Sequence, residues 1–227
     1  MTDGHIFCDK YFEKRESAVR EKIGKQLDQL EKEFEQLHSP VMVRLMNAKL
    51  EKALTLEELL SFEPSRRQGI VSAVLYNDAF WRLEAARIML TVGMFNVCYS
   101  NLRSCLETIV TAHIIENLDA EAIKFIKQKA IVPAKIATFI PDKYNEAIIG
   151  MKKTLGNWGV HCSINGTQIG LAFGPSTSDK MLSKTSTQRK EALNEDFANV
   201  AITCINVMND VFLLFMFLIH KGTTYRK

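Results

Sequence analysis

Apolar positions recur with a helical period along most of the chain, beginning near its N-terminus. From Asp9 to Leu37 the sequence is rich in Glu, Lys and Gln, and from Ile23 onward its apolar residues are spaced alternately by four and by three. This heptad spacing predicts one long helix whose narrow apolar stripe pairs with a single partner helix, in this chain or in a second copy. The stripe comprises Phe12, Val19, Ile23, Leu27, Leu30, Phe34 and Leu37.

Proline and threonine residues divide the next part of the sequence. Pro40 predicts a break followed by a new helix, Thr55 is a typical cap for a short helix, and Pro64 predicts the end of this unit. We therefore place a domain boundary here. Residues 1–64 are expected to form an N-terminal helical extension that carries the heptad helix, and residues 65–227 a helical bundle domain.

Two helices that meet at Gly93 form the clearest unit of the sequence. The first is predicted over residues 66–90 and the second over residues 95–116, and Gly93 has the place of a C-terminal glycine between them. Together they predict an antiparallel hairpin. The apolar stripe expected on the first helix comprises Ile70, Val74, Asn77, Trp81, Glu84 and Ile88. The residues expected to be buried on the second helix are Phe95, Cys98, Leu102, Cys105, Ile109 and His113.

The remaining sequence continues the helical pattern with one interruption. Helices are predicted over residues 119–129, 141–158 and 190–220. Between the last two, Asn165 and Gly166 form a two-residue turn signal between short stretches, which predicts a small β-hairpin. The predicted fold class is therefore all-α: an antiparallel helical bundle with a long N-terminal heptad helix and a small β-hairpin insertion.

Composition restricts the class of protein without deciding its partner. The chain of 227 residues is 47% hydrophobic and 24% charged, which is typical of a globular protein with a substantial core. A net charge of +3 is weaker than the basic footprint of a dedicated nucleic-acid binder. The five cysteines lack C-x-x-C spacing, which favours buried core thiols in a reducing cytoplasm. No metal or cofactor motif is present, so neither is predicted.

The most apolar run of the sequence lies near its end. Residues 211–219 are nine consecutive apolar residues, and polar residues precede them. A bilayer requires a helix of about 20 apolar residues. We therefore expect a buried helix end and no membrane span.

Arg103 and Glu107 form the best candidate site in the sequence. They lie four residues apart among apolar residues of the second hairpin helix, so they are expected to pair. One interpretation is an ordinary ion pair on a solvated face, worth about 0.2 to 0.5 kcal/mol. Another is an anion site, in which the planar fork of Arg103 holds a phosphate and Glu107 orients the fork. A buried pair without a ligand would instead fix the helix register.

His161 is the candidate catalytic residue. It follows Trp158 by three residues, where the predicted helix turns into the hairpin. A histidine on a loop near a helix end is better placed for proton transfer than one on a helix face. The alternative is a structural imidazole that bonds to a backbone carbonyl. Trp158 offers a surface on which a base can stack.

The glycine-turn helix pair resembles that of HEPN-like helical bundles and related uncharacterised prokaryotic families, over roughly residues 70–165. The resemblance rests on Gly93, Phe95, Cys98, Leu102, Arg103, Glu107 and the segment from Leu155 to His161. It implies a helical protein, often dimeric, in a group that includes ribonucleases and nucleotide-linked proteins of defence and toxin systems. HEPN ribonucleases carry an Arg followed shortly by a His on one helix. Here nine residues separate Arg103 from His113.

These observations lead to one hypothesis and two alternatives. The hypothesis is a cytoplasmic homodimer that binds a nucleotide or RNA in a cleft bordered by Arg103, Glu107, Trp158 and His161, with Asn77 on the preceding helix as a further ligand-binding residue. The first alternative is a non-catalytic homodimeric protein interaction module. The second is an RNA-cleaving toxin or defence protein. The sequence leaves open whether the protein is an enzyme.

Overall fold

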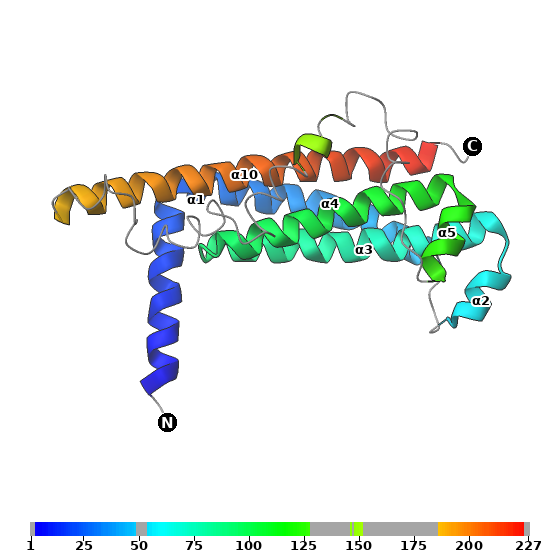
Figure 1. The fold of residues 1–227 in the computed structure, drawn as a ribbon, viewed down its shortest axis with the longest axis horizontal. Coiled ribbons are helices and arrows are strands. Elements are labelled where there is room, and N and C mark those ends of the chain that lie inside the picture. Colours follow the sequence, from blue (N-terminus) through cyan, green and yellow to red (C-terminus); the bar gives the residue numbers. More distant parts are fainter. Residues whose placement is uncertain (1–2, 49–53, 128–145, 147, 152–185, 225–227) are drawn as a thin grey trace.

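The computed structural model describes residues 3–48, 54–127, 146, 148–151 and 186–224. Every regular element within these residues is a helix (Figure 1), which confirms the all-α class. The predicted β-hairpin at Asn165 and Gly166 lies outside the described residues. The main helices are α1 (Asp3–Asn47), α2 (Leu56–Ser61), α3 (Pro64–Thr91), α4 (Phe95–Asn117), α5 (Asp119–Ile126) and α10 (Ser186–Thr224).

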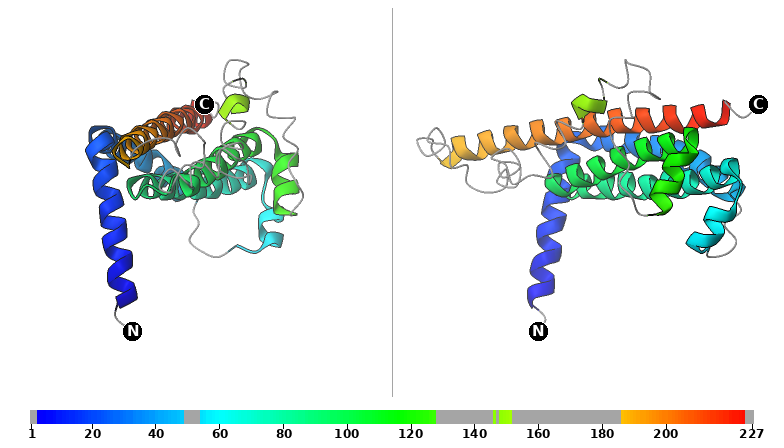
Figure 2. Two further views of the ribbon diagram at one scale, coloured as in Figure 1. Left: turned by 60° about the vertical axis from the view of Figure 1, so that its left-hand side comes forward. Right: turned by 45° about the vertical axis from the view of Figure 1, so that its right-hand side comes forward.

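Helix α1 continues through Pro40, so the predicted break there is wrong. Leu37 and Val41, on either side of the proline, are both fully buried. Burying two such side chains contributes about 3 to 6 kcal/mol, which offsets the cost of about 3 kcal/mol for a proline within a helix. The helix bends instead at Ile23, whose φ of −133° and ψ of 19° are not helical. The part before this bend projects away from the other helices (Figures 1 and 2).

The heptad stripe of α1 is buried against helices of its own chain. Its described side chains belong to the same hydrophobic core as those of α3, α4 and α10. Phe34 shows this directly, because its ring lies 6.0 Å from the ring of Phe212 on α10 and 6.4 Å from that of Phe80 on α3. The side chain of Phe12 lies outside the described part of the chain. The domain boundary at residue 64 stays a prediction.

Gly93 makes the turn between α3 and α4, as the sequence predicts. Its φ of 68° lies in the left-handed region, which an L side chain rarely adopts. The amide of Gly93 donates to the carbonyl of Leu90 at 3.0 Å, and the amide of Met94 donates to that of Met89 at 2.8 Å. These bonds satisfy carbonyls that the end of α3 leaves free. The chain can therefore reverse within a few residues.

The buried face of α3 differs from the predicted stripe. Ile70 of that stripe is buried as predicted, at 4% exposure, but Val74, Trp81 and Ile88 are 43%, 58% and 45% exposed. The side chains that pack on α1, α4 and α10 instead include Tyr76 and Leu83, both fully buried. Apolar residues occupy two faces of this helix, and helical periodicity alone cannot tell which face meets the core.

Helices α1, α4 and α10 run in the same direction, and α3 runs against them (Figures 1 and 2). The C-terminal parts of the three parallel helices therefore meet at one end of the molecule. Arg44 of α1, Glu116 of α4 and Ile219 of α10 are joined there by hydrogen bonds. The antiparallel arrangement expected from the sequence holds for α3 relative to its neighbours. It does not hold for α4 and α10, which are parallel.

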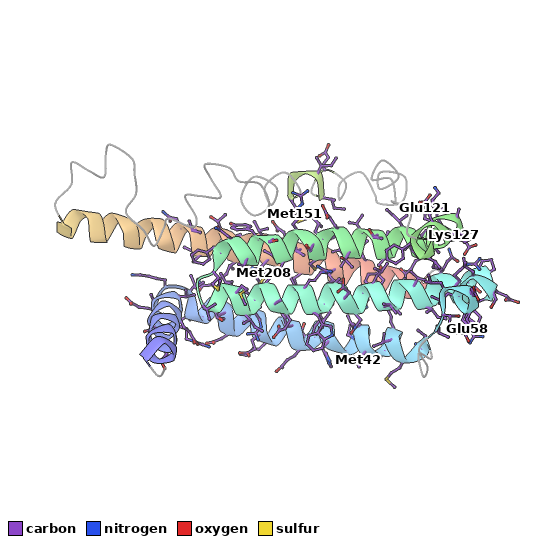
Figure 3. The ribbon with its side chains drawn as sticks, turned by 60° about the horizontal axis from the view of Figure 1, so that its bottom comes forward. Met42, Glu58, Glu121, Lys127, Met151 and Met208 are labelled. Carbon is purple, nitrogen blue, oxygen red and sulfur yellow. The ribbon has the colours of Figure 1, made fainter. Side chains whose placement is uncertain are left out.

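Helix α10 contains a segment, Asn199–His220, that is long and apolar enough by length and composition to cross a membrane. Its 22 residues have a mean hydropathy of 2.0. The expectation above considered only the nine-residue run at its end. The central helix of a soluble core meets the same criterion. Cys204, Met208 and Phe215 of this segment are fully buried in the hydrophobic core, and 56% of the segment is buried in all. Figure 3 shows Met208 among the helices.

Candidate functional site

A pocket of about 250 Å³ lies between α3, α4 and the end of α5. Helix α4 contributes the side chains of Ser104, Glu107, Thr108 and Thr111, and α3 and α5 contribute Leu75, Arg82 and Phe125. Ser104, Thr108 and Thr111 share one face because residues three or four apart on a helix are neighbours. The wall of the pocket thus combines hydroxyl groups, one carboxylate and one guanidinium with two apolar side chains.

Arg103 and Glu107 pair as the sequence predicts. The Nε of Arg103 donates to Oε1 of Glu107 at 3.2 Å. The side chains are 27% and 48% exposed, so water reaches both. Glu107 lines the pocket, whereas Arg103 is not among the lining side chains and adjoins the pocket only through its pair with Glu107. The geometry is that of a surface pair beside a pocket, and a pair of this kind contributes only about 0.3 to 0.5 kcal/mol.

Arg82 on the opposite wall has a similar local partner. Its Nε donates to Oδ2 of Asp78 at 2.7 Å, and both side chains are more than 40% exposed. Thr108 donates its hydroxyl hydrogen to the carbonyl of Ser104 at 2.8 Å, so in this rotamer its side chain offers only lone pairs. In these pairs each arginine uses only its Nε, so the Nη groups of Arg82 and Arg103 can still donate to an anion.

The other predicted site residues are not brought into this pocket. Asn77 is half-buried on α3, outside the pocket lining. Trp158 and His161 lie outside the described residues, so their predicted roles stay predictions. His113 is only 7% exposed in the core, as expected for a histidine on the apolar face of α4.

A cluster of buried polar side chains joins all four long helices, and the sequence analysis did not identify it. Arg44 of α1 forms an ion pair with Glu116 of α4, and the two side chains are only 12% and 9% exposed. From α3, Tyr76 donates its hydroxyl to Oε2 of Glu116 at 3.2 Å, and Ser72 donates to Oε1 at 3.4 Å. Arg44 also donates to the carbonyl of Ile219 on α10.

The geometry of this Arg44 cluster explains why charges are tolerated there. Arg44 lies 4.7 Å from the centre of the Tyr76 ring and near the C-terminal parts of three parallel helices, whose carbonyl ends carry partial negative charge. Burial raises the pKa of Tyr76 well above its ordinary value, so its hydroxyl stays a donor to Glu116. Both charged residues continue an apolar stripe, Arg44 three residues after Val41 and Glu116 three after His113. That spacing was the available sequence signal.

A second polar clamp fixes α2 and α5 to α3. Arg67 is 6% exposed and donates to both carboxylate oxygens of Asp119, at 2.9 and 2.7 Å. It also donates to the carbonyls of Leu60 and Phe62, each at 2.8 Å. The hydrogen bond to Asp119 is the main cause that raises the pKa of Arg67. Figure 3 shows Glu58 of α2 and Glu121 of α5 at this same end of the molecule.

The three cysteines whose side chains the structure describes are core residues. Cys98, Cys105 and Cys204 are free thiols that are fully buried. Burial raises the pKa of Cys98 and Cys105, which keeps both thiols protonated and unreactive at neutral pH. Among the residues that the structure describes, no three His, Cys, Asp or Glu side chains gather closely enough to hold a metal ion.

Asp210 makes the stability of α10 depend on pH. Asp210 is an exposed residue, but desolvation of its carboxyl raises the pKa above the ordinary value of 3.8, so folding slightly disfavours its charged form. The folded protein therefore loses stability as the pH rises through the range between the unfolded and folded pKa values. We expect Asp210→Asn to raise the melting temperature at pH 7 and to have no effect at a pH below 3.8. Thermal unfolding at both pH values tests this, with Asp28→Asn on the exposed face of α1 as the control. A gain at pH 7 that persists at the lower pH would show that charge is not its cause.

No family model, curated protein or solved structure matches this chain. The case for a function therefore rests on the geometry of the site.

Proposed function

We propose that this protein is a HEPN-like helical bundle that binds a phosphate group of a nucleotide or RNA in the pocket between α3 and α4. In this proposal it acts in the cytoplasm as a homodimer, and Trp158 and His161 contribute stacking and a proton or hydrogen bond. The observation that supports it most is the position of Glu107, which lines the pocket while pairing with Arg103. The pair singled out by sequence thus adjoins a hollow large enough for a ligand.

The chemistry of the pocket wall suits a phosphate. Arg82 of α3 lines the pocket together with the hydroxyls of Ser104 and Thr111 on α4, and Arg103 pairs with the lining residue Glu107. Guanidinium groups bind phosphate oxygens through paired hydrogen bonds, and hydroxyls add neutral donors. Phe125, which is 39% exposed at the pocket, offers an apolar surface for a sugar or base.

The energies also permit a phosphate to displace the existing partners. The exposed pair of Arg103 with Glu107 contributes about 0.3 to 0.5 kcal/mol, whereas a hydrogen bond to a charged group contributes about 1.5 to 3 kcal/mol. The pocket volume of about 250 Å³ lies just below the ~300 Å³ at which pockets for drug-sized ligands begin. It therefore suits a phosphate and its sugar, with the rest of the ligand in the open groove.

Arg103→Ala tests the proposal directly. We expect this variant to bind a fluorescent nucleoside monophosphate and a short single-stranded RNA about 10- to 100-fold more weakly, which corresponds to the loss of about 1.5 to 3 kcal/mol. Fluorescence anisotropy at fixed ionic strength measures both affinities. Loss of affinity for the nucleotide alone, or for RNA alone, identifies which ligand uses the pocket.

Arg20→Ala is the matched control for this measurement. Arg20 and Glu16 form the same i, i+4 pair on α1, with an Nε to Oε1 distance of 2.9 Å and side chains that are 54% and 43% exposed. We expect equal affinity in this variant and in the unaltered protein. Equal affinity in Arg103→Ala, with an unchanged circular dichroism spectrum, would refute the proposal.

A further inference from the structure

The face of α3 that points away from the core carries an apolar stripe. Val74, Trp81 and Ile88 follow one another at intervals of seven residues and are 43%, 58% and 45% exposed. An interval of seven residues is close to two helical turns, so the three side chains lie in line. We call them the outer α3 stripe. An exposed row that includes a tryptophan is typical of an interaction surface and not of a solvated helix face.

We propose that the outer α3 stripe is the contact between two copies of this chain, which pair antiparallel about a twofold axis beside Trp81. This contact specifies the homodimer of the proposed function and rests on that part of it, whereas phosphate binding in the pocket is tested separately by Arg103→Ala. We choose a second copy as the partner because the apolar and charged residues of the stripe match those of the same stripe in reversed orientation.

The apolar residues are symmetric about Trp81. Val74 precedes it by seven residues and Ile88 follows it by seven. A twofold axis at Trp81 reverses the helix direction and therefore places Val74 of one copy against Ile88 of the other, twice. The two tryptophans meet at the centre. An isologous contact needs this self-complementarity, which a stripe built for an unrelated partner does not require.

The charged residues on one flank of the stripe are also complementary to themselves. Asp78 lies three residues before Trp81 and Arg82 lies one residue after it, on the side of α3 that faces the pocket. In an antiparallel pair related by a twofold axis, like flanks face each other. Asp78 of one copy then lies within about two residues, or ~3 Å along the axis, of Arg82 of the other. Arg82 already pairs through its Nε with Asp78 of its own copy, and its Nη groups can donate to Asp78 of the other copy.

The opposite flank offers a matching pair of polar groups. Asn77 lies four residues before Trp81, and Glu84 lies three residues after it. The same operation brings the amide of Asn77 beside the carboxylate of Glu84 in the other copy. Glu84 already accepts from Nε and Nη2 of Arg87 in its own copy, at 2.9 and 2.7 Å, so the amide of Asn77 is an additional donor to this carboxylate. These two polar residues therefore belong to the interface.

The length of the stripe sets the strength of the dimer. Fourteen residues separate Val74 from Ile88, which corresponds to about 21 Å of helix. A contact between two helices over this distance is smaller than the ~800 Å² per partner of a stable interface. We therefore expect a dimer whose population rises with protein concentration.

Sedimentation velocity of the full chain tests the proposal. Over about a hundredfold range of concentration we expect the unaltered protein to shift from monomer to dimer, and Trp81→Glu to stay monomeric throughout. Leu213→Glu is the matched control, because Leu213 is an exposed apolar residue on α10, at 63% exposure, and it should leave the shift unchanged. A protein that is monomeric at every concentration, or a dimer that Trp81→Glu does not weaken, would overturn the proposal. A monomer destabilised by Trp81→Glu would mean that another part of this chain covers the stripe, which also overturns it.

Cross-linking tests the register independently of Trp81. Val74 and Ile88 lie seven residues to either side of Trp81, so each should face the other across the axis. We expect a mixture of Val74→Cys and Ile88→Cys proteins to form a disulfide-linked dimer on mild oxidation. Val74→Cys alone should form none beyond the background of the unaltered protein, because its two copies lie about 21 Å apart along the axis. Equal cross-linking in both samples would exclude this register.

Discussion

Glu116→Ala should lower the free energy of unfolding by about 3 to 5 kcal/mol, because it leaves the guanidinium of Arg44 buried without its counter-charge. The ion pair that the substitution breaks is nearly enclosed, with side chains 12% and 9% exposed. Tyr76 and Ser72 also lose their acceptor in Glu116. Urea unfolding followed by circular dichroism measures the change.

Two further variants separate the buried charge from general damage to α4. Glu107→Ala removes a carboxylate from the same helix, but that side chain is 48% exposed, so the loss should stay at about 0.5 kcal/mol or less. In the double variant Arg44→Met with Glu116→Leu, neither charge remains, and apolar replacement of a buried pair is often neutral. We expect this double variant to recover most of the lost stability. A loss in Glu116→Ala no larger than that in Glu107→Ala would show that the Arg44 cluster is not a structural centre.

Arg67→Ala should cost about 2 to 4 kcal/mol, because one buried side chain supplies four charge-assisted or carbonyl hydrogen bonds. Its removal exposes Asp119 to water but leaves the carbonyls of Leu60 and Phe62 without their donor. The helices that Arg67 connects, α2 and α5, should also open more readily. Hydrogen exchange of their amides, together with urea unfolding, measures both effects.

Arg66 provides the control for Arg67. It is the neighbouring residue and also a guanidinium, but it is exposed and rests on the ring of Phe62, with 4.0 Å between the Cζ atom and the ring centre. A cation–π interaction at an exposed site contributes about 0.5 to 1 kcal/mol to the free energy of unfolding. We expect Arg66→Ala to stay within that loss and to leave exchange in α5 unchanged. Similar losses in the two variants would mean that the clamp at Asp119 adds no stability.

Much of α4 and its turn could be predicted from the sequence, because local rules decide them. Gly93 was expected to end α3, and its positive φ confirms the reason. The predicted buried residues of α4, from Phe95 to Ile109, are at most 1% exposed, and His113 is also buried. The pair of Arg103 and Glu107 followed from their spacing. Each of these features depends on residues within a few helical turns of one another.

The candidate site was predictable only in part, because it also depends on residues that are far apart in the sequence. The sequence indicated one wall, on α4, whereas Arg82 and Phe125 reach the pocket from other helices. The ion pair of Arg44 with Glu116 joins residues 72 positions apart, and helical periodicity does not report which stripes face each other. A charge within an apolar stripe was visible at both positions. Its partner was not.

The sequence by itself determined the all-α class, the turn at Gly93 and the apolar face of α4, because spacing and backbone preference act over short distances along the chain. Only the tertiary structure decided that α1 continues through Pro40, that the heptad stripe packs within its own chain, and that Trp81 lies on the outer face of α3. These outcomes depend on the balance between the free energy gained by packing and the free energy lost by unfavourable local backbone or side-chain placement. That balance is set by helices that approach one another in space, and it has no signature in any one segment of the sequence.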